Sequence, residues 1–217
     1  YLTSTQLPLF IAAMQNTYQT MFPSIVANGD VTSVINDRHR ERLQRYRTDA
    51  EAQGAEIISC AEDNADWKSS EHRLPLQLVI NPCDDSLIMK HEIFGPLLVI
   101  KTYDDLDNLI TQIQQNNRPL ALYYFGTSKE NERKVINRVI SGGVTLNDVM
   151  MHPALHDAPF GGVGASGLGH YNGIEGFKTF SHAKGIYKQS PVDAVVKLTR
   201  PPFTNMFDRL ISSRIKK

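Results

Sequence analysis

Glu92 and Phe94 are the residues of this chain whose types and spacing point most directly to chemistry. A carboxylate accepts hydrogen bonds through two oxygens, so Glu92 suits a ligand with paired hydroxyls, such as a ribose. If the backbone is extended, Phe94 projects to the same side and offers a flat apolar face to a ring. The same spacing also fits an exposed acid at a turn beside a core phenylalanine. The pair therefore predicts a ligand site only if the surrounding sequence supports one.

Residues 162–167 match the GxGxxG pattern of dinucleotide-binding loops. In such loops the glycines follow a strand, open a helix and precede an acidic residue by about 20 positions. Here the preceding segment, 152–159, contains Pro153 and Pro159 and does not predict a strand. No acidic residue stands at the required distance. We therefore interpret these glycines as a loop that lets the main chain pass close to a substrate channel.

Two further patterns give no site. His152 and His156 have the i, i+4 spacing of a helical zinc pair, but Pro153 argues against the regular helix that such a pair needs. Ser166 does not stand in a GxSxG sequence, so no serine-hydrolase elbow is indicated. We expect no metal site in the chain.

The composition favours an ordinary globular protein. The 217 residues suffice for one substantial core or one domain with appendages, and Lys plus Arg equals Asp plus Glu at 23 each, which gives no field for nucleic acid or anionic membranes. No apolar run approaches the roughly 20 residues that span a bilayer. The two cysteines, Cys60 and Cys83, form no CxxC pair and favour a reducing, cytoplasmic location with unreactive thiols. The start, without Met or a signal pattern, predicts an internal fragment.

Two helices are predicted near the start of the chain. Apolar residues recur at helical spacing over residues 5–22, with Ser4 as the expected N-cap. A second helix is predicted over residues 37–53, capped by Asp37 and stopped by Gly54. Its five arginines alternate with acids, so we interpret it as a solvated face and not as a nucleic-acid surface.

Beyond these helices, short apolar runs alternate with helical segments. This order predicts parallel strands with right-handed crossovers, and hence an α/β fold with an open, mostly parallel sheet flanked by helices. Thr127 and Glu130 are expected to form a capping box, and the polar residues 62–73 predict an irregular connector. The expected strands are 55–59, 76–80, 97–103, 120–125 and 143–147, and the expected helices are 104–116 and 128–140.

The C-terminal part is broken by prolines. A short helix is expected from Gly173, and the segment 179–187, from Thr179 to Tyr187, predicts a strand with no sheet of its own to join. An unpaired edge invites pairing with another chain. An apolar stripe from Phe203 to Ile211 predicts a last amphipathic helix, for which packing on protein is favoured over a membrane surface.

Four segments carry a family resemblance. They are residues 89–96 (MKHEIFGP), 141–148 (SGGVTLND), 157–169 (DAPFGGVGASGLG) and 176–182 (GFKTFSH). In this order and at about this separation they resemble the C-terminal half of the aldehyde dehydrogenase superfamily, with details most like the class 3 and coniferyl aldehyde dehydrogenase branch. The resemblance is clear from about Leu74 to Tyr187 and weaker back to Tyr1.

This resemblance implies the catalytic domain of an enzyme that oxidises an aldehyde to its carboxylic acid with NAD or NADP. It implies that Glu92 and Phe94 contact the nicotinamide half of the cofactor. The cysteine nucleophile and the general base would lie upstream of Tyr1, so no catalytic residue is expected in this chain, and the chain alone is expected to be inactive. The residues that match aldehyde-pocket positions are Asn147, Met150, Pro153 and Phe160.

The resemblance also implies a domain organisation. Residues 1–178 would form the catalytic domain, residues 179–189 an oligomerisation strand that joins a homodimer, and residues 190–217 a tail with an amphipathic helix. The aldehyde stays open between a coniferyl-type aromatic and a medium or long chain. A function of another class also stays open, namely a non-catalytic α/β oligomerisation or binding module.

Overall fold

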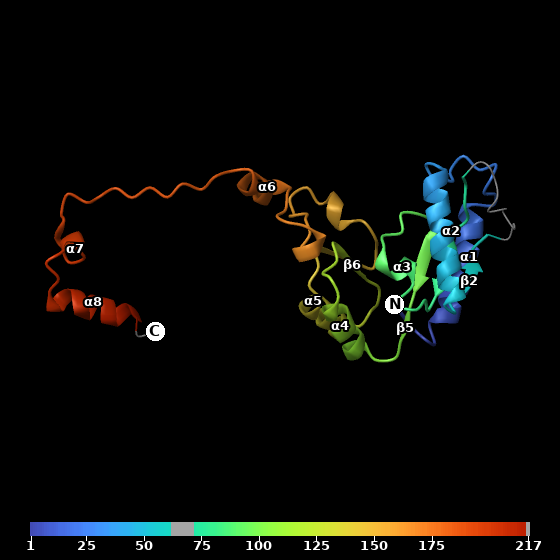
Figure 1. Cartoon of the computed structure of the whole chain (residues 1–217), viewed down its shortest axis with the longest axis horizontal. Helices are drawn as coiled ribbons and strands as arrows, with labels where there is room; N and C mark the ends of the chain where they lie inside the picture. The colour runs from blue at the N-terminus through green and yellow to red at the C-terminus, as the bar shows by residue number, and fades with distance from the viewer. Residues whose placement is uncertain (62–71, 216–217) are drawn as a thin grey trace. The chain divides into compact units, whose positions relative to one another are not determined.

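The structure is a computed structural model that describes residues 1–61 and 72–215. The expected connector at 62–73 lies almost entirely outside the described residues. Contacts divide the chain into two compact units, Tyr1–Asn116 and Asn117–Lys217, and each unit is described by itself. Figure 1 follows both units from the N-terminal helices to the C-terminal helix.

The first unit is built on a three-stranded sheet. Its central strand β3 (Gln77–Ile80) is buried throughout, pairs parallel with β4 (Leu97–Ile100) and antiparallel with β2 (Glu56–Ser59). Two short strands, β1 (Leu2–Thr3) and β5 (Thr102–Tyr103), form a separate parallel pair. Helix α4 (Leu106–Gln115) follows β5.

Two helices cover the two faces of this sheet. The apolar face of α1 (Leu7–Met21) packs against a cluster that includes Leu78 and Ile80, whereas α2 (Asp37–Ala52) packs against a cluster that includes Val79. Successive side chains of a strand point to opposite faces, so β3 supplies both clusters. Burial of apolar surface on both faces holds this unit together.

The helix caps differ from the expected ones by a residue or two. Helix α1 begins after Gln6, and Ser4 makes no cap. Asn36, and not Asp37, caps α2, because its side chain accepts a hydrogen bond from the backbone N–H of His39. The expected stop at Gly54 is confirmed by its left-handed φ of 93°, which suits a residue just past a helix end.

The second unit contains one parallel strand pair. Strand β6 (Ala121–Tyr124) leads through helix α5 (Lys129–Arg138) to β7 (Gly143–Leu146), which is the crossover that the sequence predicts. Ser128 caps α5 by accepting from the backbone N–H of Asn131, so the expected box of Thr127 and Glu130 is wrong by one residue. The remaining helices of this unit are η1 (His152–Ala154), η2 (Gly164–Ser166), α6 (Gly173–Thr179), α7 (Ala194–Lys197) and α8 (Asn205–Ile215).

The α/β class with mostly parallel pairing is confirmed, since three of the four described strand pairs are parallel. The strands are distributed over three small sheets. The expected strand at 179–187 is not formed within this chain: Thr179 ends α6, and residues 182–190 pair with no strand in the described part of the molecule. No helix in the described ranges is long and apolar enough to cross a bilayer.

Candidate functional site

The turn that carries Glu92 and Phe94 joins the short helix α3 (Leu87–Lys90) to strand β4. Both side chains are exposed, and that of Phe94 is 74% exposed. The backbone at Phe94 has a left-handed φ of 45°, so the turn is not the extended segment that would place the two side chains on one side. Non-glycine residues seldom adopt this conformation, and here it leaves an apolar ring exposed. Together these features indicate a binding surface.

Arg42 on helix α2 holds this turn through its main chain. Its Nη1 donates to the carbonyl oxygen of Glu92 at 3.0 Å, and its Nη2 donates to those of Ile93 at 2.7 Å and Phe94 at 3.5 Å. The guanidinium also lies 5.2 Å from the ring centre of Tyr46. A planar, permanently charged fork suits three carbonyls at once, and hydrogen bonds from a charged donor are roughly twice as strong as neutral ones.

The rest of the same helix face fixes the segment on either side of the turn. Tyr46 stacks on the ring of His91 at 6.0 Å, and the Asp49 carboxylate accepts from the backbone N–H of Leu87 at the start of α3. Gly95 must be glycine here, since a Cβ would stand 2.5 Å from the buried side chain of Leu43. Positions 42, 46 and 49 share one face of a helix, so α2 acts as the template for residues 87–95.

A hollow of about 640 Å³ lies beside this turn. Phe94, Gly95 and Pro96 form one wall, and His39 and Arg42 on α2 contribute its nitrogen-bearing side chains. Residues 32–35 complete the lining. An apolar wall with a few polar groups is typical of small-molecule sites.

Sequence reasoning missed the part that α2 takes in this site. It assigned all five arginines to a solvated face, and this is wrong for two of them: Arg42 holds the turn, and Arg47 donates from Nε to the side-chain oxygen of buried Gln77. The spacing of Arg42, Tyr46 and Asp49 was a usable signal, because polar and aromatic residues on one helix face indicate contacts with another part of the chain.

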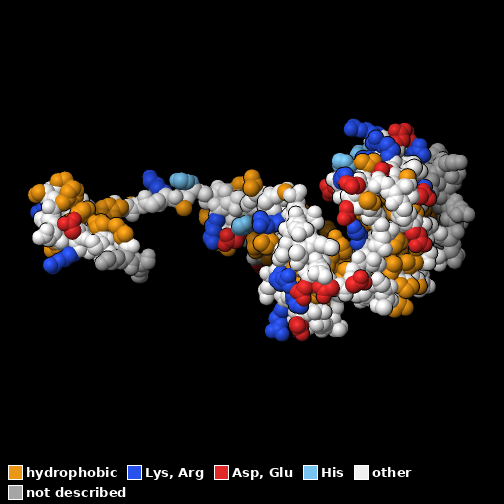
Figure 2. Space-filling view, turned by 60° about the horizontal axis from the view of Figure 1, so that its bottom comes forward, with side chains coloured by type: hydrophobic (Ala, Val, Ile, Leu, Met, Phe, Trp, Pro, Cys, Tyr) orange, Lys and Arg blue, Asp and Glu red, His pale blue; other side chains and the backbone are white. Residues whose placement is uncertain are grey.

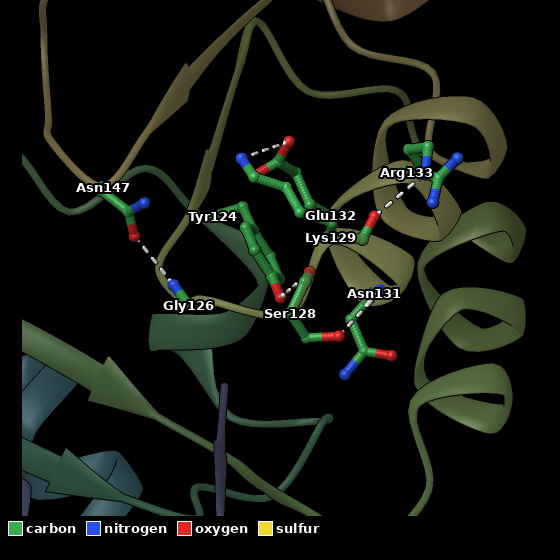
Figure 3. A network of polar contacts seen from close by, with 8 residues as sticks. All are labelled: Tyr124, Gly126, Ser128, Lys129, Asn131, Glu132, Arg133 and Asn147. Carbon is green, nitrogen blue, oxygen red and sulfur yellow. Dashed lines mark hydrogen bonds and ion pairs between the residues drawn. The ribbon is translucent and has the colours of Figure 1, made fainter.

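In the second unit, Asn147 closes the carboxyl ends of the two parallel strands. Its side-chain oxygen accepts a hydrogen bond from the backbone N–H of Gly126 at 2.8 Å. Its backbone N–H donates to the carbonyl oxygen of Tyr124 at 2.8 Å. Figure 3 shows the hydrogen bond between Gly126 and Asn147, together with the first turn of α5, which Ser128 caps. Asn147 has a left-handed φ of 55°, which asparagine tolerates better than most residues.

The other three predicted pocket residues are connected through Tyr123 and His152. Met150, exposed and with a φ of 58°, accepts a hydrogen bond at its sulfur from the Tyr123 hydroxyl at 3.1 Å. Pro153 lies in η1, next to His152, whose ring is 6.0 Å from that of Phe160. Phe160 therefore lies beside the ring of His152, Met150 is linked to that ring through Tyr123, and Pro153 follows His152 in the chain. Asn147 lies at the strand end just before them.

The glycine loop is closed on itself. Phe160 and Tyr171 exchange two backbone hydrogen bonds of 2.9 Å at its base, and the Val163 N–H donates to the Ser166 hydroxyl inside it. No strand precedes the loop apart from this bridge, and the short η2 takes the place of a long helix in this described segment. The structure thus agrees that the GxGxxG match is not a dinucleotide fingerprint.

Neither cysteine stands in a reactive setting that the structure supports. Cys60 is buried in the cluster beneath α1, and this burial raises the pKa of its thiol, which disfavours the thiolate nucleophile. Cys83 is exposed and free. Within residues 1–61 and 72–215, no three His, Cys, Asp or Glu side chains converge as metal ligands do.

Comparison with known proteins identifies the family. The coniferyl aldehyde dehydrogenase of a Pseudomonas species is 42% identical over 214 residues, which cover 97% of this chain and 44% of that protein. The probable coniferyl aldehyde dehydrogenase of Caulobacter vibrioides is 40% identical over 210 residues, or 96% of this chain and 43% of that one. A substrate-bound state of AldH from Staphylococcus aureus matches with a TM-score of 0.78 at 33% identity, and covers 97% of this chain and 44% of that one.

The fold is accordingly that of the aldehyde dehydrogenases. The profile of the aldehyde dehydrogenase family matches residues 5–186, and the chain belongs to this family. It spans less than half the length of the relatives it matches.

Replacing Arg42 by lysine should loosen the turn that carries Glu92 and Phe94. A single ammonium cannot serve three carbonyls in the geometry of a guanidinium, and each lost charged hydrogen bond is worth about 1.5–3 kcal/mol. We expect Arg42→Lys to lower the free energy of unfolding in urea by about 1.5–3 kcal/mol. Arg45→Lys, at an exposed position of the same helix, should stay within about 0.5 kcal/mol of wild type. Equal effects of the two changes would contradict the assigned role of Arg42.

Proposed function

We propose that this chain is the C-terminal portion of an NAD(P)-dependent aldehyde dehydrogenase. The observation that carries the proposal is the hollow beside the exposed Phe94, with Arg42 fixing the turn and Glu92 next to it. Membership of the aldehyde dehydrogenase family supports it. The function is the oxidation of an aldehyde to its carboxylic acid by a protein that contains this chain.

The proposed part of this chain in the reaction is to hold and orient the cofactor. The nicotinamide, when bound, supplies the hydride acceptor. Glu92 accepts hydrogen bonds from the ribose hydroxyls, and Phe94 packs its exposed ring against the nicotinamide. The residues present fit this group, because the apolar wall of the hollow includes Phe94, and the carboxylate of Glu92 stands two positions earlier in the same turn. Whether the cofactor is NAD or NADP is set by other contacts.

The proposed aldehyde is apolar and bulky. Met150, Pro153 and Phe160 would line its pocket, and Asn147 would hold the strand end that precedes them. The names of the relatives from Pseudomonas and Caulobacter support a coniferyl-type aromatic aldehyde over a medium or long alkyl chain. Two free cysteines support a reducing, cytoplasmic location.

The proposed partner is a second copy of the chain. Residues 179–189 would form a strand between subunits, after a catalytic domain of residues 1–178 and before a tail of residues 190–217. Phe180, Ile186 and Tyr187 are at least 77% exposed in the single chain, which supports their burial by another subunit. The tail carries apolar side chains around α8 (Figure 2). The rings of Phe203 and Phe207 lie 4.6 Å apart.

Glu92→Gln is the direct test of the cofactor role. Glutamine keeps the shape but weakens charged hydrogen bonds to the ribose, each worth roughly 1.5–3 kcal/mol. We expect hydride transfer in the full-length protein to slow about 10-fold or more, because the nicotinamide is oriented less well. Single-turnover NADH formation measures this step. Glu41→Gln, on the exposed side of α2, is the matched control. A hydride-transfer rate as fast in Glu92→Gln as in this control would reduce Glu92 to an ordinary turn residue.

The 217-residue chain alone should produce no NADH from coniferyl aldehyde. Its buried cysteine has a raised pKa, and the family resemblance assigns the nucleophile to another part of the protein. The assay compares the purified chain with the full-length protein at equal concentration. Turnover by the chain that disappears in Cys83→Ser would show that the exposed thiol is the nucleophile.

Two prolines in the proposed intersubunit strand should separate the subunits. Gly185→Pro together with Ile186→Pro removes two backbone donors, which a strand in the middle of a joint sheet cannot spare. We expect sedimentation of the full-length protein at low micromolar concentration to change from dimer to monomer. Gly185→Ala with Ile186→Val keeps both donors and serves as the control. An intact dimer in the proline variant would refute the assignment of residues 179–189.

A further inference from the structure

His152 is a half-buried residue among the predicted aldehyde-pocket positions, and the proposed function gives it no role. Its Nδ1 lies 2.7 Å from the hydroxyl oxygen of Thr145, and its backbone N–H donates to the same oxygen at 3.2 Å. Thr145 is itself buried, in the middle of β7. The hydroxyl of Thr145 therefore makes hydrogen bonds with both the backbone N–H and the ring nitrogen Nδ1 of His152, the first residue of η1.

The imidazole ring is enclosed by aromatic neighbours. It lies 5.9 Å from the ring of Tyr123 and 6.0 Å from that of Phe160. Tyr123 is the register partner of Thr145 across the β6–β7 pair, and its hydroxyl holds the sulfur of Met150. Phe160 in turn packs edge-on against Tyr171 at 5.5 Å, across the base of the glycine loop. The ring of His152 thus lies beside Phe160 and beside Tyr123, which binds Met150.

The first residue of β7 is shaped to admit this ring. A Cβ on Gly143 would stand 2.4 Å from the Cδ2 atom and 2.8 Å from the Nε2 atom of His152, a contact that no real side chain tolerates. The Nε2 atom is buried and has no hydrogen-bond partner within the described ranges. Because Nε2 faces the backbone of the strand, it is not directed at a reacting atom. The ring is held by Nδ1 and by packing.

We infer that Thr145 and His152 form a latch that positions the aldehyde-pocket loop, with His152 as a positioning residue. The inference rests on the proposed function and deepens it. The latch fixes where Met150 and Pro153 stand relative to Phe160, and so sets the width of the aldehyde pocket. Met150 has a left-handed backbone that requires outside support, and the latch two residues later supplies it. The turn that carries Glu92 and Phe94 belongs to the other unit.

Asparagine and leucine, which are similar to each other in shape, are placed at position 152 to separate the effect of the hydrogen bond from that of side-chain volume. Asparagine at position 152 keeps a polar nitrogen near the place of Nδ1, whereas leucine of similar size has none. We expect His152→Leu in the full-length enzyme to raise the KM for coniferyl aldehyde about 10-fold, since roughly one buried hydrogen bond is lost. The KM for the cofactor should stay within about twofold. His152→Asn should recover most of the aldehyde KM. His156→Leu, at an exposed position of the same loop, is the control.

A double-mutant cycle on the 217-residue chain tests the latch without any activity. Thr145→Val removes the hydroxyl and keeps the shape of the side chain. If the two side chains act together, Thr145→Val and His152→Leu combined should cost little more than either alone. The coupling should be at least about fivefold in the unfolding constant, measured in urea.

The outcomes distinguish the latch from the proposed function. Coupling in the chain and a selective rise in the aldehyde KM, rescued by asparagine, support the inference. Independent effects of the two changes overturn it, and so does a cofactor KM that rises as much as the aldehyde KM, because that indicates a general loss of structure. If the wild-type full-length protein oxidises no aldehyde, the proposed function fails and takes the pocket role with it, while the cycle still reports whether the latch exists.

Discussion

The fixed charge of Arg42 substitutes for secondary structure at the turn that bears Glu92 and Phe94. The carbonyl oxygens of Glu92, Ile93 and Phe94 have no strand partner among the described residues, and the guanidinium of Arg42 donates hydrogen bonds to all three. Converging carbonyl oxygens repel one another. The cation of Arg42 offsets this repulsion and so stabilises the left-handed backbone at Phe94. The exposed ring and the hollow beside it follow from that backbone. Helix α2 can act in this way because its buried residues Leu43, Tyr46 and Ala50 anchor it in the core.

A second device recurs at the carboxyl ends of the parallel strands. Asn147 after β7 donates its N–H to Tyr124, the last residue of β6, and accepts from Gly126. Asn81 after β3 does the same with Ile100, the last residue of β4, and with Thr102. Both asparagines have left-handed φ angles, 55° and 47°. In both units an asparagine therefore ends the ladder with one extra hydrogen bond and turns the chain away from the sheet. The carboxyl edge of parallel strands is where α/β folds place their ligands, so the device leaves the following residues at that edge.

The sequence was sufficient for the class of fold and for most elements, because these depend on local periodicity. The apolar spacing of α1 and the alternation of strands and helices after Gly54 predict the observed order within a few residues. Caps were wrong by one residue at α2 and α5, since neighbouring Asn, Asp, Ser and Thr all have side chains able to cap, and only backbone geometry selects one. The partners of Arg42 could not be predicted, because its hydrogen bonds join residues 50 to 52 positions apart. The spacing of Arg42, Tyr46 and Asp49 indicates a contact with another part of the chain but does not say which part. The predicted strand at 179–187 pairs with no strand in the described part of the single chain, so local pattern alone did not predict the observed structure there.

The two candidate regions solve the same physical problem by different means. A ligand site needs exposed side chains on a backbone that does not move, and exposed backbone lacks the packing that holds a core. Near Glu92 the support is a charge on a helix, which is strong and works over several carbonyls. Near Met150 the support is a neutral hydroxyl and an enclosed ring, which depend on shape and on the absence of a side chain at Gly143. Under the proposed function, the charged support would hold the turn that binds the cofactor. The support that depends on shape would set the width of the aldehyde pocket, which small changes in packing around the ring of His152 would alter.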